Sequence, residues 1–337
     1  MKKWIILILL GVIAYSSYIL FIKVTHFSKE KVSFQYNQEG LQALADSLSA
    51  KKIIRDKYSF LLMANVFDVE NKMKAGKFSV EKNTSLLKLI RMFRNNQQAK
   101  VKLVINKLRL KSDVAKLLAS SFDIDSAQCM LYLTSNDSLA PFATDTTQVL
   151  SLFIPNTYEF YASSPLPKIF QKMKNEEEIF WSKKNRLAKA NAIGLTKNEV
   201  YILASIVEEE TNFDSDKTII ASVYQNRLKK KMPLQACPTI KYAMQDFTLT
   251  RIYDKYLTNP SPYNTYKKTG LPPGPICTPS PTTIDLVLNA PSTTYYYFVA
   301  KADFSGYHHF STTYEEHSKF AKEYQRKLDE YQAKKNK

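Results

Sequence analysis

Glycine is scarce in this sequence, because the 337 residues include only 7. None of them forms the G-x-G-x-x-G spacing of dinucleotide-binding proteins or the G-x-x-x-x-G-K-[ST] spacing of a P-loop. The chain therefore lacks the usual phosphate cradle of both enzyme classes. Hydrophobic residues make up 45% and charged residues 23%, which excludes wholesale disorder. The length of 337 residues allows about two folded units.

Cysteine and histidine are also few, with 3 and 4 residues. The cysteines Cys129, Cys237 and Cys277 show no C-x-x-C spacing, and the histidines form no H-E-x-x-H motif. The sequence therefore predicts neither a metal site nor a cofactor. A disulfide between two of the three cysteines is left open if the chain lies outside the cytoplasm.

Acidic residues are outnumbered, since 48 Lys and Arg stand against 31 Asp and Glu and give a net charge of +17. This charge favours polyanionic partners or anionic surfaces. Nucleic acid is disfavoured, because the basic residues are scattered and no zinc-finger, RNP or basic-zipper pattern is present. Peptidoglycan with its peptide carboxylates and an anionic lipid surface suit the charge equally well.

One long apolar run lies near the N-terminus. Residues 4–22 carry no charge and would extend about 28 Å as a helix, enough to cross a bilayer. A cleaved signal peptide is the alternative, with a tolerable cleavage site at 12–14, but the apolar run exceeds a normal signal core. We therefore predict an uncleaved transmembrane anchor, with residues 1–3 in the cytoplasm and a polar linker at 23–31.

Residues 32–110 show the pattern of a small α+β domain. Alternating apolar residues indicate strands, and apolar residues at helical spacing indicate helices. With the stretch between them interpreted as helix, the predicted order is strand, helix, helix, strand, helix. The segments that carry these patterns are strands at 32–36 and 77–80 and helices at 41–48 and 86–93.

A helix that ends in three glutamates is predicted to start at residue 197. Thr196–Glu199 reads T-x-x-E, which is a capping box, and Val200, Leu203, Ala204 and Val207 follow at helical spacing. The helix then runs into three consecutive glutamates, although acids in a last turn oppose the helix dipole. At about 100° per residue the middle glutamate should face water, while the other two flank the apolar stripe.

These flanking glutamates, Glu208 and Glu210, are candidate general acids. A carboxyl group beside apolar surface resists ionisation, which raises its pKa and lets it donate a proton near neutrality. A solvated cluster of glutamates at a helix end is the alternative interpretation. Helical geometry alone does not choose between the two residues.

Six short motifs occur in order between residues 204 and 300: ASIVEEET, ASVYQNRL, LQACPT, SPYNTY, TGLPPGPI and YYYFVA. This series resembles the endolytic murein transglycosylase family, also called the YceG-like family. The resemblance covers residues 150–325, because FIPNTYEFY at 153–161 is similar to the family's entry segment.

The resemblance implies an α+β architecture in several parts. One transmembrane helix precedes a LysM-like domain at 32–110, whose KAGKFSV segment at 74–80 resembles the K-A-G-x-[FY] turn of that domain. Residues 111–149 connect it to a mixed α/β catalytic domain at 150–325. A basic tail follows at 326–337.

The resemblance assigns catalysis to Glu208, the first acid of the family's V-E-x-E-T motif, and makes Glu210 the second acid. Family members often carry Asp where this chain has Cys237, so no role of that Asp carries over. Position and residue type suggest further contacts with sugar hydroxyls and rings. The predicted substrate-binding residues are Asn226, Gln235, Tyr263, Asn264, Tyr266 and Glu210.

The implied reaction cleaves the bond between N-acetylmuramic acid and N-acetylglucosamine without water. Glu208 would protonate the leaving glycosidic oxygen and then accept the proton of the muramoyl C6 hydroxyl, which closes onto C1 as a 1,6-anhydro ring. A hydrolase with two carboxylates would need them about 5–5.5 Å or about 6.5–9.5 Å apart. A lysozyme-like hydrolase and a non-catalytic, membrane-anchored peptidoglycan-binding scaffold are the alternatives.

The resemblance also implies where the chain acts. It predicts a single-pass protein of the bacterial inner membrane with its catalytic domain on the extracytoplasmic side. The expected partners are peptidoglycan glycan strands, whose nascent length it would limit, and penicillin-binding proteins of the synthesis machinery. Nucleic acid is not among them.

Overall fold

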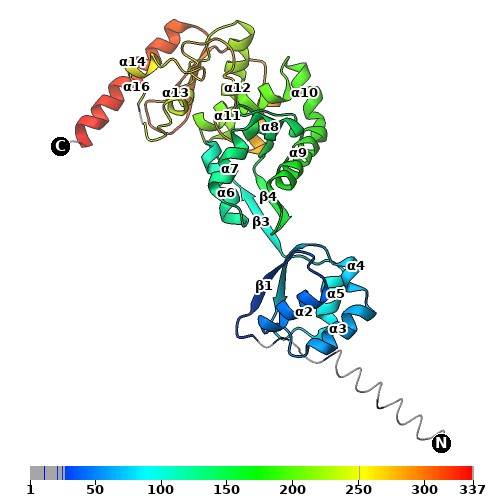
Figure 1. The fold of residues 1–337 in the computed structure, drawn as a ribbon. Coiled ribbons are helices and arrows are strands. Elements are labelled where there is room, and N and C mark those ends of the chain that lie inside the picture. The colour runs from blue at the N-terminus through cyan, green and yellow to red at the C-terminus, as the bar shows by residue number, and fades with distance from the viewer. Residues whose placement is uncertain (1–10, 12–20, 22–24, 26, 250, 336–337) are drawn as a thin grey trace, which may run out of the picture. The chain divides into compact units, whose positions relative to one another are not determined.

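The computed structural model describes residues 11, 21, 25, 27–249 and 251–335, and these residues divide into two compact units (Figure 1). Unit 1 contains the chain up to Lys102 with two short later segments, Ser121–Asp123 and Glu159–Ser164, and unit 2 contains the rest. Within the described residues no helix is long and apolar enough to cross a membrane. The anchor predicted at 4–22 lies outside them, apart from two residues.

Unit 1 contains an antiparallel pair of strands, β1 and β2, in which Phe34 lies opposite Phe78. The order of elements confirms the predicted strand, helix, helix, strand, helix, with one additional short helix before the second strand. The elements are β1 (Lys31–Tyr36), α2 (Leu41–Ala50), α3 (Lys57–Val66), α4 (Val69–Lys72), β2 (Gly76–Glu81) and α5 (Leu86–Arg94).

The core of unit 1 is aromatic. Phe93 of α5 makes edge-to-face contacts with Phe34, Phe60 and Phe78, at ring-centroid distances of 5.9, 6.1 and 5.5 Å. Such edge-to-face pairs stabilise a core beyond the area that they bury. All four rings are buried, so the core ties both strands to α3 and α5.

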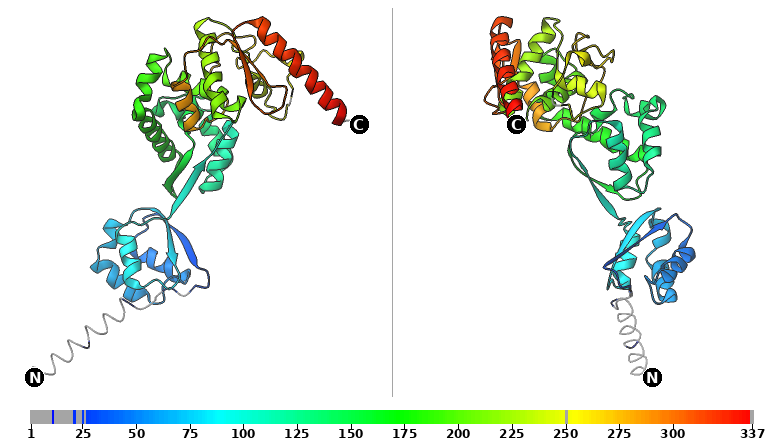
Figure 2. Two further views of the ribbon diagram at one scale, coloured as in Figure 1. Left: turned by 180° about the vertical axis from the view of Figure 1, so that it is seen from behind. Right: turned by 90° about the vertical axis from the view of Figure 1, so that its left-hand side faces the viewer.

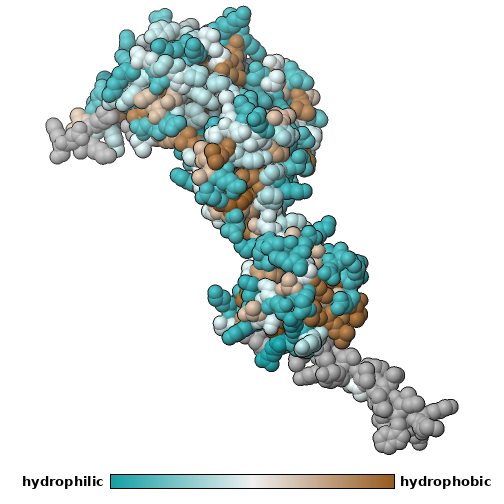
Figure 3. Space-filling model, viewed as in Figure 1, coloured by the Kyte–Doolittle hydropathy of each residue, from teal (hydrophilic) through white to brown (hydrophobic). Residues whose placement is uncertain are grey.

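The outer face of α3 is apolar. Tyr58, Leu62 and Val66 are spaced four residues apart, and each is more than half exposed. Residues at this spacing share one side of a helix. Figure 3 shows apolar surface on unit 1 amid largely hydrophilic surface.

The first part of unit 2 is mainly helical. Strands β3 (Lys100–Ile105) and β4 (Asn156–Tyr161) form a two-stranded sheet, and the boundary between the units falls within these strands. The segment at 111–149, predicted to connect two domains, forms helices of its own. The helices here are α6 (Lys111–Ser121), α7 (Ser126–Leu133), α8 (Asn136–Leu139), α9 (Leu166–Ser182) and α10 (Arg186–Ala192), with short 3-10 turns at Ala140–Phe142, Val149–Leu152 and Lys183–Asn185.

The rest of unit 2 surrounds one central helix, α11 (Lys197–Glu210). Figure 2 gives two further views, in which the C-terminal helix, drawn in red, lies at the periphery of the unit and extends to Lys335, within the predicted basic tail. The remaining elements are α12 (Asp214–Lys229), α13 (Cys237–Met244), α14 (Asp254–Leu257), α15 (Pro281–Leu288), the antiparallel strands β5 (Tyr297–Ala300) and β6 (His308–Ser311), and α16 (Tyr314–Lys335).

Helix α11 begins as the sequence predicts. The Thr196 hydroxyl accepts a hydrogen bond from the Glu199 amide at 3.2 Å, and the Glu199 carboxylate accepts one from the Thr196 amide at 2.8 Å. This capping box satisfies donors that a helix start otherwise leaves free. Its burial exceeds the prediction, because every residue from Val200 to Val207 is buried rather than one stripe.

Candidate active site

The three glutamates that end α11 reach three different parts of unit 2. The helix packs against α12, α13 and α15, so its last turn lies among other elements instead of at the surface. Each of the three residues is only partly exposed. The three carboxylates therefore have different surroundings.

Glu208 joins three helices. Its Oε2 accepts hydrogen bonds from Lys217 Nζ at 3.1 Å, from Ser280 Oγ at 3.2 Å and from Thr283 Oγ1. Lys217 is itself 5% exposed and also donates to Thr283 at 3.0 Å. Among the described residues the bonds of this carboxylate fall on one oxygen, and they link α11 to α12 and to the start of α15.

Glu209 does not face water, which corrects the prediction from helical periodicity. Arg109 binds it with two hydrogen bonds of 3.1 and 2.9 Å, and Lys107 Nζ lies 3.1 Å from Oε1. Only 14% of its side chain is exposed. The chain after β3 covers this side of the helix, a contact 100 residues distant that periodicity along one helix cannot reveal.

The same contacts determine the charge state of Glu209. Burial raises its pKa, but the hydrogen bond from Arg109 and the positive charges of Lys107 and Arg109 outweigh burial, so the pKa lies below its ordinary value. The carboxylate is therefore ionised near neutrality and forms part of a charged network. A carboxylate that is ionised near neutrality has no proton to donate there.

Glu210 has a different partner, a neutral phenol. The hydroxyl of the fully buried Tyr224 donates to Glu210 Oε1 at 2.5 Å. Burial raises the pKa of Glu210 to about 7, against the lowering effects of the Tyr224 hydrogen bond and of the Lys241 charge, while the charge of Glu209 raises it further. This is the environment expected for a general acid at the edge of an apolar stripe.

Two loops from distant parts of the sequence meet beside Glu210. Cys237 Sγ lies 3.1 Å from the Tyr266 hydroxyl, and burial together with interactions with Cys237 and Glu210 raises the pKa of Tyr266. Gln235, exposed in the same loop, accepts a hydrogen bond from Arg227 at 3.2 Å. Of the predicted site residues, Tyr266 thus interacts with Glu210, and Gln235 lies in the same loop as Cys237.

Two predicted substrate-binding residues have their amide hydrogens engaged inside the protein. Asn226 donates to the carbonyls of Thr293 and Tyr295 at 2.9 and 3.0 Å. Asn264 is 0% exposed, donates to the carbonyls of Leu257 and Asn259, and accepts from the Tyr266 amide. A fully buried, fully bonded amide cannot contact a sugar, so Asn264 shapes its loop instead.

Comparison with known proteins shows the family of this chain. The model of the YceG-like family matches residues 36–323, which is most of the chain. The chain belongs to the YceG-like family. A YceG-like protein from Listeria monocytogenes, solved at 2.6 Å, is 25% identical, with a TM-score of 0.57 over 87% of this chain and 99% of that one.

Curated relatives match this chain over shorter stretches. An endolytic murein transglycosylase of Bacillus subtilis (strain 168) is 38% identical over 171 residues, covering 50% of this chain and 46% of that protein. One from Streptococcus pneumoniae (strain D39) is 34% identical over 155 residues, covering 43% and 27%. The matched region of this YceG-like chain spans less than half the length of these relatives.

Sequence reasoning missed the two partners that distinguish the carboxylates of this YceG-like chain. Tyr224 lies within the ASVYQNRL motif, and a tyrosine on a buried helix face signals a hydroxyl that needs a partner. Lys217, in the first turn of α12, is 5% exposed, and only its tertiary contacts account for its position.

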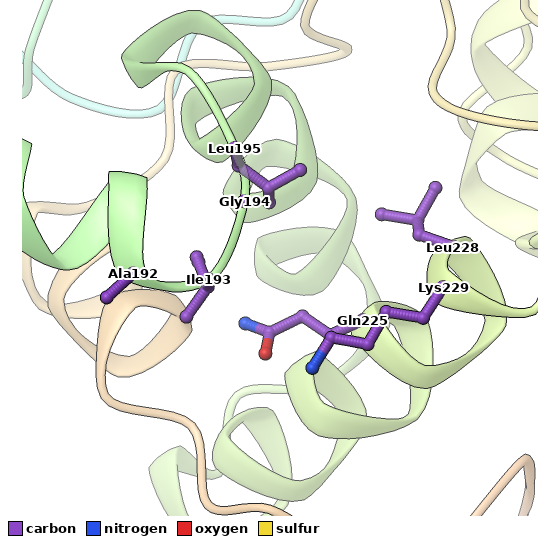
Figure 4. A pocket seen from close by; sticks show the side chains of 7 residues that line it. All are labelled: Ala192, Ile193, Gly194, Leu195, Gln225, Leu228 and Lys229. Atoms are coloured by element: carbon purple, nitrogen blue, oxygen red, sulfur yellow. The ribbon is translucent and has the colours of Figure 1, made fainter.

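Two pockets of unit 2 have none of the three glutamates among their lining residues. The first, about 460 Å³, lies between the end of α10 and α12, where Ile193, Leu195 and Gln225 line it (Figure 4). Gln225 donates to a backbone carbonyl at 2.8 Å, and Lys229 is the charged residue among those that line this pocket. The second, about 320 Å³, includes Tyr263.

The structure shows the state of the three cysteines and tests for groups of metal ligands. All three cysteines are free, with Cys237 exposed and the other two buried, so the disulfide that the sequence left open is not formed. In the described part of the chain, no three His, Cys, Asp or Glu side chains come together in a way that could hold a metal ion.

Glu209→Gln tests the charged network. We expect the variant to lose about 1–2 kcal/mol of unfolding free energy at neutral pH, because Arg109 and Lys107 lose their partially buried counter-ion. The pKa of Glu209 is lower in the folded than in the unfolded chain, so its stabilisation is present above the unfolded value of 4.5 and is lost as pH falls through the folded one.

Urea unfolding of wild type and variant from neutral to acidic pH measures this difference. Glu178→Gln is the matched control, since its carboxylate is 59% exposed and its ion pair should contribute little. Equal stability of wild type and Glu209→Gln at neutral pH would contradict the assignment.

Proposed function

We propose that this chain is a lytic transglycosylase that cleaves peptidoglycan glycan strands within their length, with Glu210 as its general acid. The observation that carries the proposal is the partly buried Glu210, whose pKa is about 7 and whose neighbours come from the LQACPT and SPYNTY loops. Membership of the YceG-like family and relatives named endolytic murein transglycosylase support the reaction class.

In the proposed reaction one carboxyl group acts twice. Protonated Glu210 donates its proton to the glycosidic oxygen as the bond to C1 of N-acetylmuramic acid breaks. The resulting carboxylate then accepts the proton of the C6 hydroxyl, whose oxygen forms the new bond to C1 and closes the 1,6-anhydro ring. Tyr224 donates to Oε1 of Glu210, and we assign the proton transfers to Oε2.

The glutamate that we propose as the general acid differs from the one that the sequence resemblance assigns. The resemblance assigns catalysis to Glu208, but that carboxylate accepts bonds from Lys217, Ser280 and Thr283 and joins three helices. Among the described residues, Glu210 accepts a hydrogen bond from one neutral donor, and its pKa is close to the operating pH of a general acid. We therefore give Glu208 a structural role and Glu210 the proton transfers.

The alternatives of a hydrolase and of a binding scaffold lead to different products. A lysozyme-like hydrolase needs a second carboxylate for water or for a covalent intermediate. We assign neither role to Glu208 or Glu209, because basic side chains hold both carboxylates within the fold. A non-catalytic scaffold would have no use for an acid with a pKa of about 7.

Location and partners form the second part of the proposal. We propose that residues 4–22 anchor the chain in the cytoplasmic membrane, that unit 1 is LysM-like, and that unit 2 acts outside the cytoplasm. Thr25, three residues after the apolar run, is buried in unit 1 and accepts a hydrogen bond from the Thr84 amide at 2.8 Å. An anchor would therefore hold unit 1 at the membrane surface. Coupling to penicillin-binding proteins and control of nascent strand length rest on the family resemblance.

Glu210→Gln should leave a folded protein without turnover, because the amide keeps the shape of the side chain but cannot donate the proton. Mass spectrometry of digested peptidoglycan measures the products, and wild type should give anhydromuramoyl ends. Glu208→Gln should lower stability and retain some turnover. Reducing ends from wild type would indicate a hydrolase, and a fully active Glu210→Gln would overturn its role.

Tyr224→Phe should move the pH profile. The Tyr224 hydroxyl stabilises the Glu210 carboxylate, so its removal raises the pKa of Glu210, by about one unit, and shifts the alkaline fall of kcat/KM to higher pH. Tyr201→Phe is the control, because its buried hydroxyl bonds only backbone carbonyls. An unmoved alkaline limb in Tyr224→Phe would contradict the arrangement.

The anchor is tested by cell fractionation. Full-length protein should stay with membranes after a carbonate wash, and its N-terminus should begin at or next to Met1. A mature chain that begins near residue 15 would show cleavage of a signal peptide instead.

A further inference from the structure

The second pocket of unit 2 lies apart from the three glutamates and has an unusual lining. It measures about 320 Å³ and lies between the loop at 146–150, the end of α13 and the loop before Tyr263. Tyr242 and Tyr263 contribute aromatic rings, and Thr146, Ser261 and Lys111 contribute polar groups. No carboxylate is among its lining residues.

The two rings form a fixed surface. Their centroids are 4.7 Å apart, the planes are inclined by 45°, and both residues pack on the core of unit 2 while staying partly exposed. Lys111 is positioned by a hydrogen bond of 3.1 Å to the Thr146 carbonyl and retains two other ammonium hydrogens. Aromatic faces beside neutral polar groups suit a sugar ring, which has apolar C–H faces and a rim of hydroxyl and amide groups.

The pocket shares two elements with the surroundings of Glu210. Helix α13 begins at Cys237, which interacts with Glu210, and Tyr242 follows five residues later, about 7.5 Å along the helix axis. Tyr263 precedes Tyr266 in the SPYNTY loop by three residues. A polymer bound at Glu210 can therefore extend along α13 toward the pocket.

We propose that this pocket is an outlying saccharide subsite, which binds an N-acetylated sugar ring of the glycan strand away from the bond that is cleaved. The proposal rests on the proposed function, because it takes the strand bound at Glu210 as its ligand. Only strands long enough to reach both places gain the additional contact. Such a subsite favours long strands over short fragments and so favours cuts within a strand.

The experiment measures binding separately from cleavage. In the full chain carrying Glu210→Gln, isothermal titration with N-acetylglucosamine oligomers of two to six units should show a stepwise rise in affinity once the oligomer reaches the pocket. Adding Tyr242→Leu should remove this step, a loss of about tenfold for the longest oligomer, while the shortest oligomer binds unchanged. Tyr242→Phe, which keeps the ring, should retain the step.

Two further variants keep the result decisive. Tyr253→Ala removes a tyrosine that is 52% exposed and outside the pocket, so it should leave the step in place. If Tyr242→Leu does not fold, Thr147→Trp fills the pocket from an exposed loop position and should remove the step in its place. A step that persists in a folded Tyr242→Leu or in Thr147→Trp overturns the subsite, as does an equal loss at every oligomer length.

The products that the wild type forms test the proposed reaction independently of the proposed subsite. A length-dependent step that needs Tyr242, in a chain whose wild type forms no anhydromuramoyl ends, would support the subsite and reject the transglycosylase. Anhydromuramoyl products without any length-dependent step would reject the subsite alone.

Discussion

Every side chain from Val200 to Val207 is buried in unit 2, so α11 carries its last turn, with three consecutive carboxylates, into the interior of the unit. A buried carboxylate costs several kcal/mol unless it is paired or hydrogen-bonded. The helix dipole adds to this cost, because the C-terminal end of a helix is its negative end. The packing of α12, α15 and the chain after β3 around this turn supplies a separate partner to each carboxylate.

The partners of the three carboxylates differ in charge. Glu208 and Glu209 bind cationic side chains, which allow a carboxylate to be buried and which connect distant segments of unit 2. Glu210 meets a neutral phenol in the same buried region, and its pKa rises to about 7. Neighbouring residues of one type thus acquire different acid–base properties, because the elements packed around them differ.

The loops beside Glu210 hold their shape through contacts of their own. Arg227 donates to the carbonyls of Pro233 and Leu234, and the Gln235 amide donates to the Thr265 carbonyl. The amide of Asn264 closes the SPYNTY loop on itself. Polar residues in such motifs therefore divide into those that hold the loop and those, such as Tyr266, that interact with Glu210.

Local sequence determined the parts of this protein that depend on neighbouring residues. The capping box at Thr196, the strand and helix order of unit 1 and the apolar face of α11 follow from spacing along the chain, because helices and strands repeat at fixed periods. Motif order indicated the family. Periodicity along α11 left two candidate acids open and wrongly turned Glu209 toward water. Only the tertiary structure brought Arg109, Lys217 and Tyr224 to consecutive glutamates, because pKa and burial depend on groups that are near in space and distant in sequence.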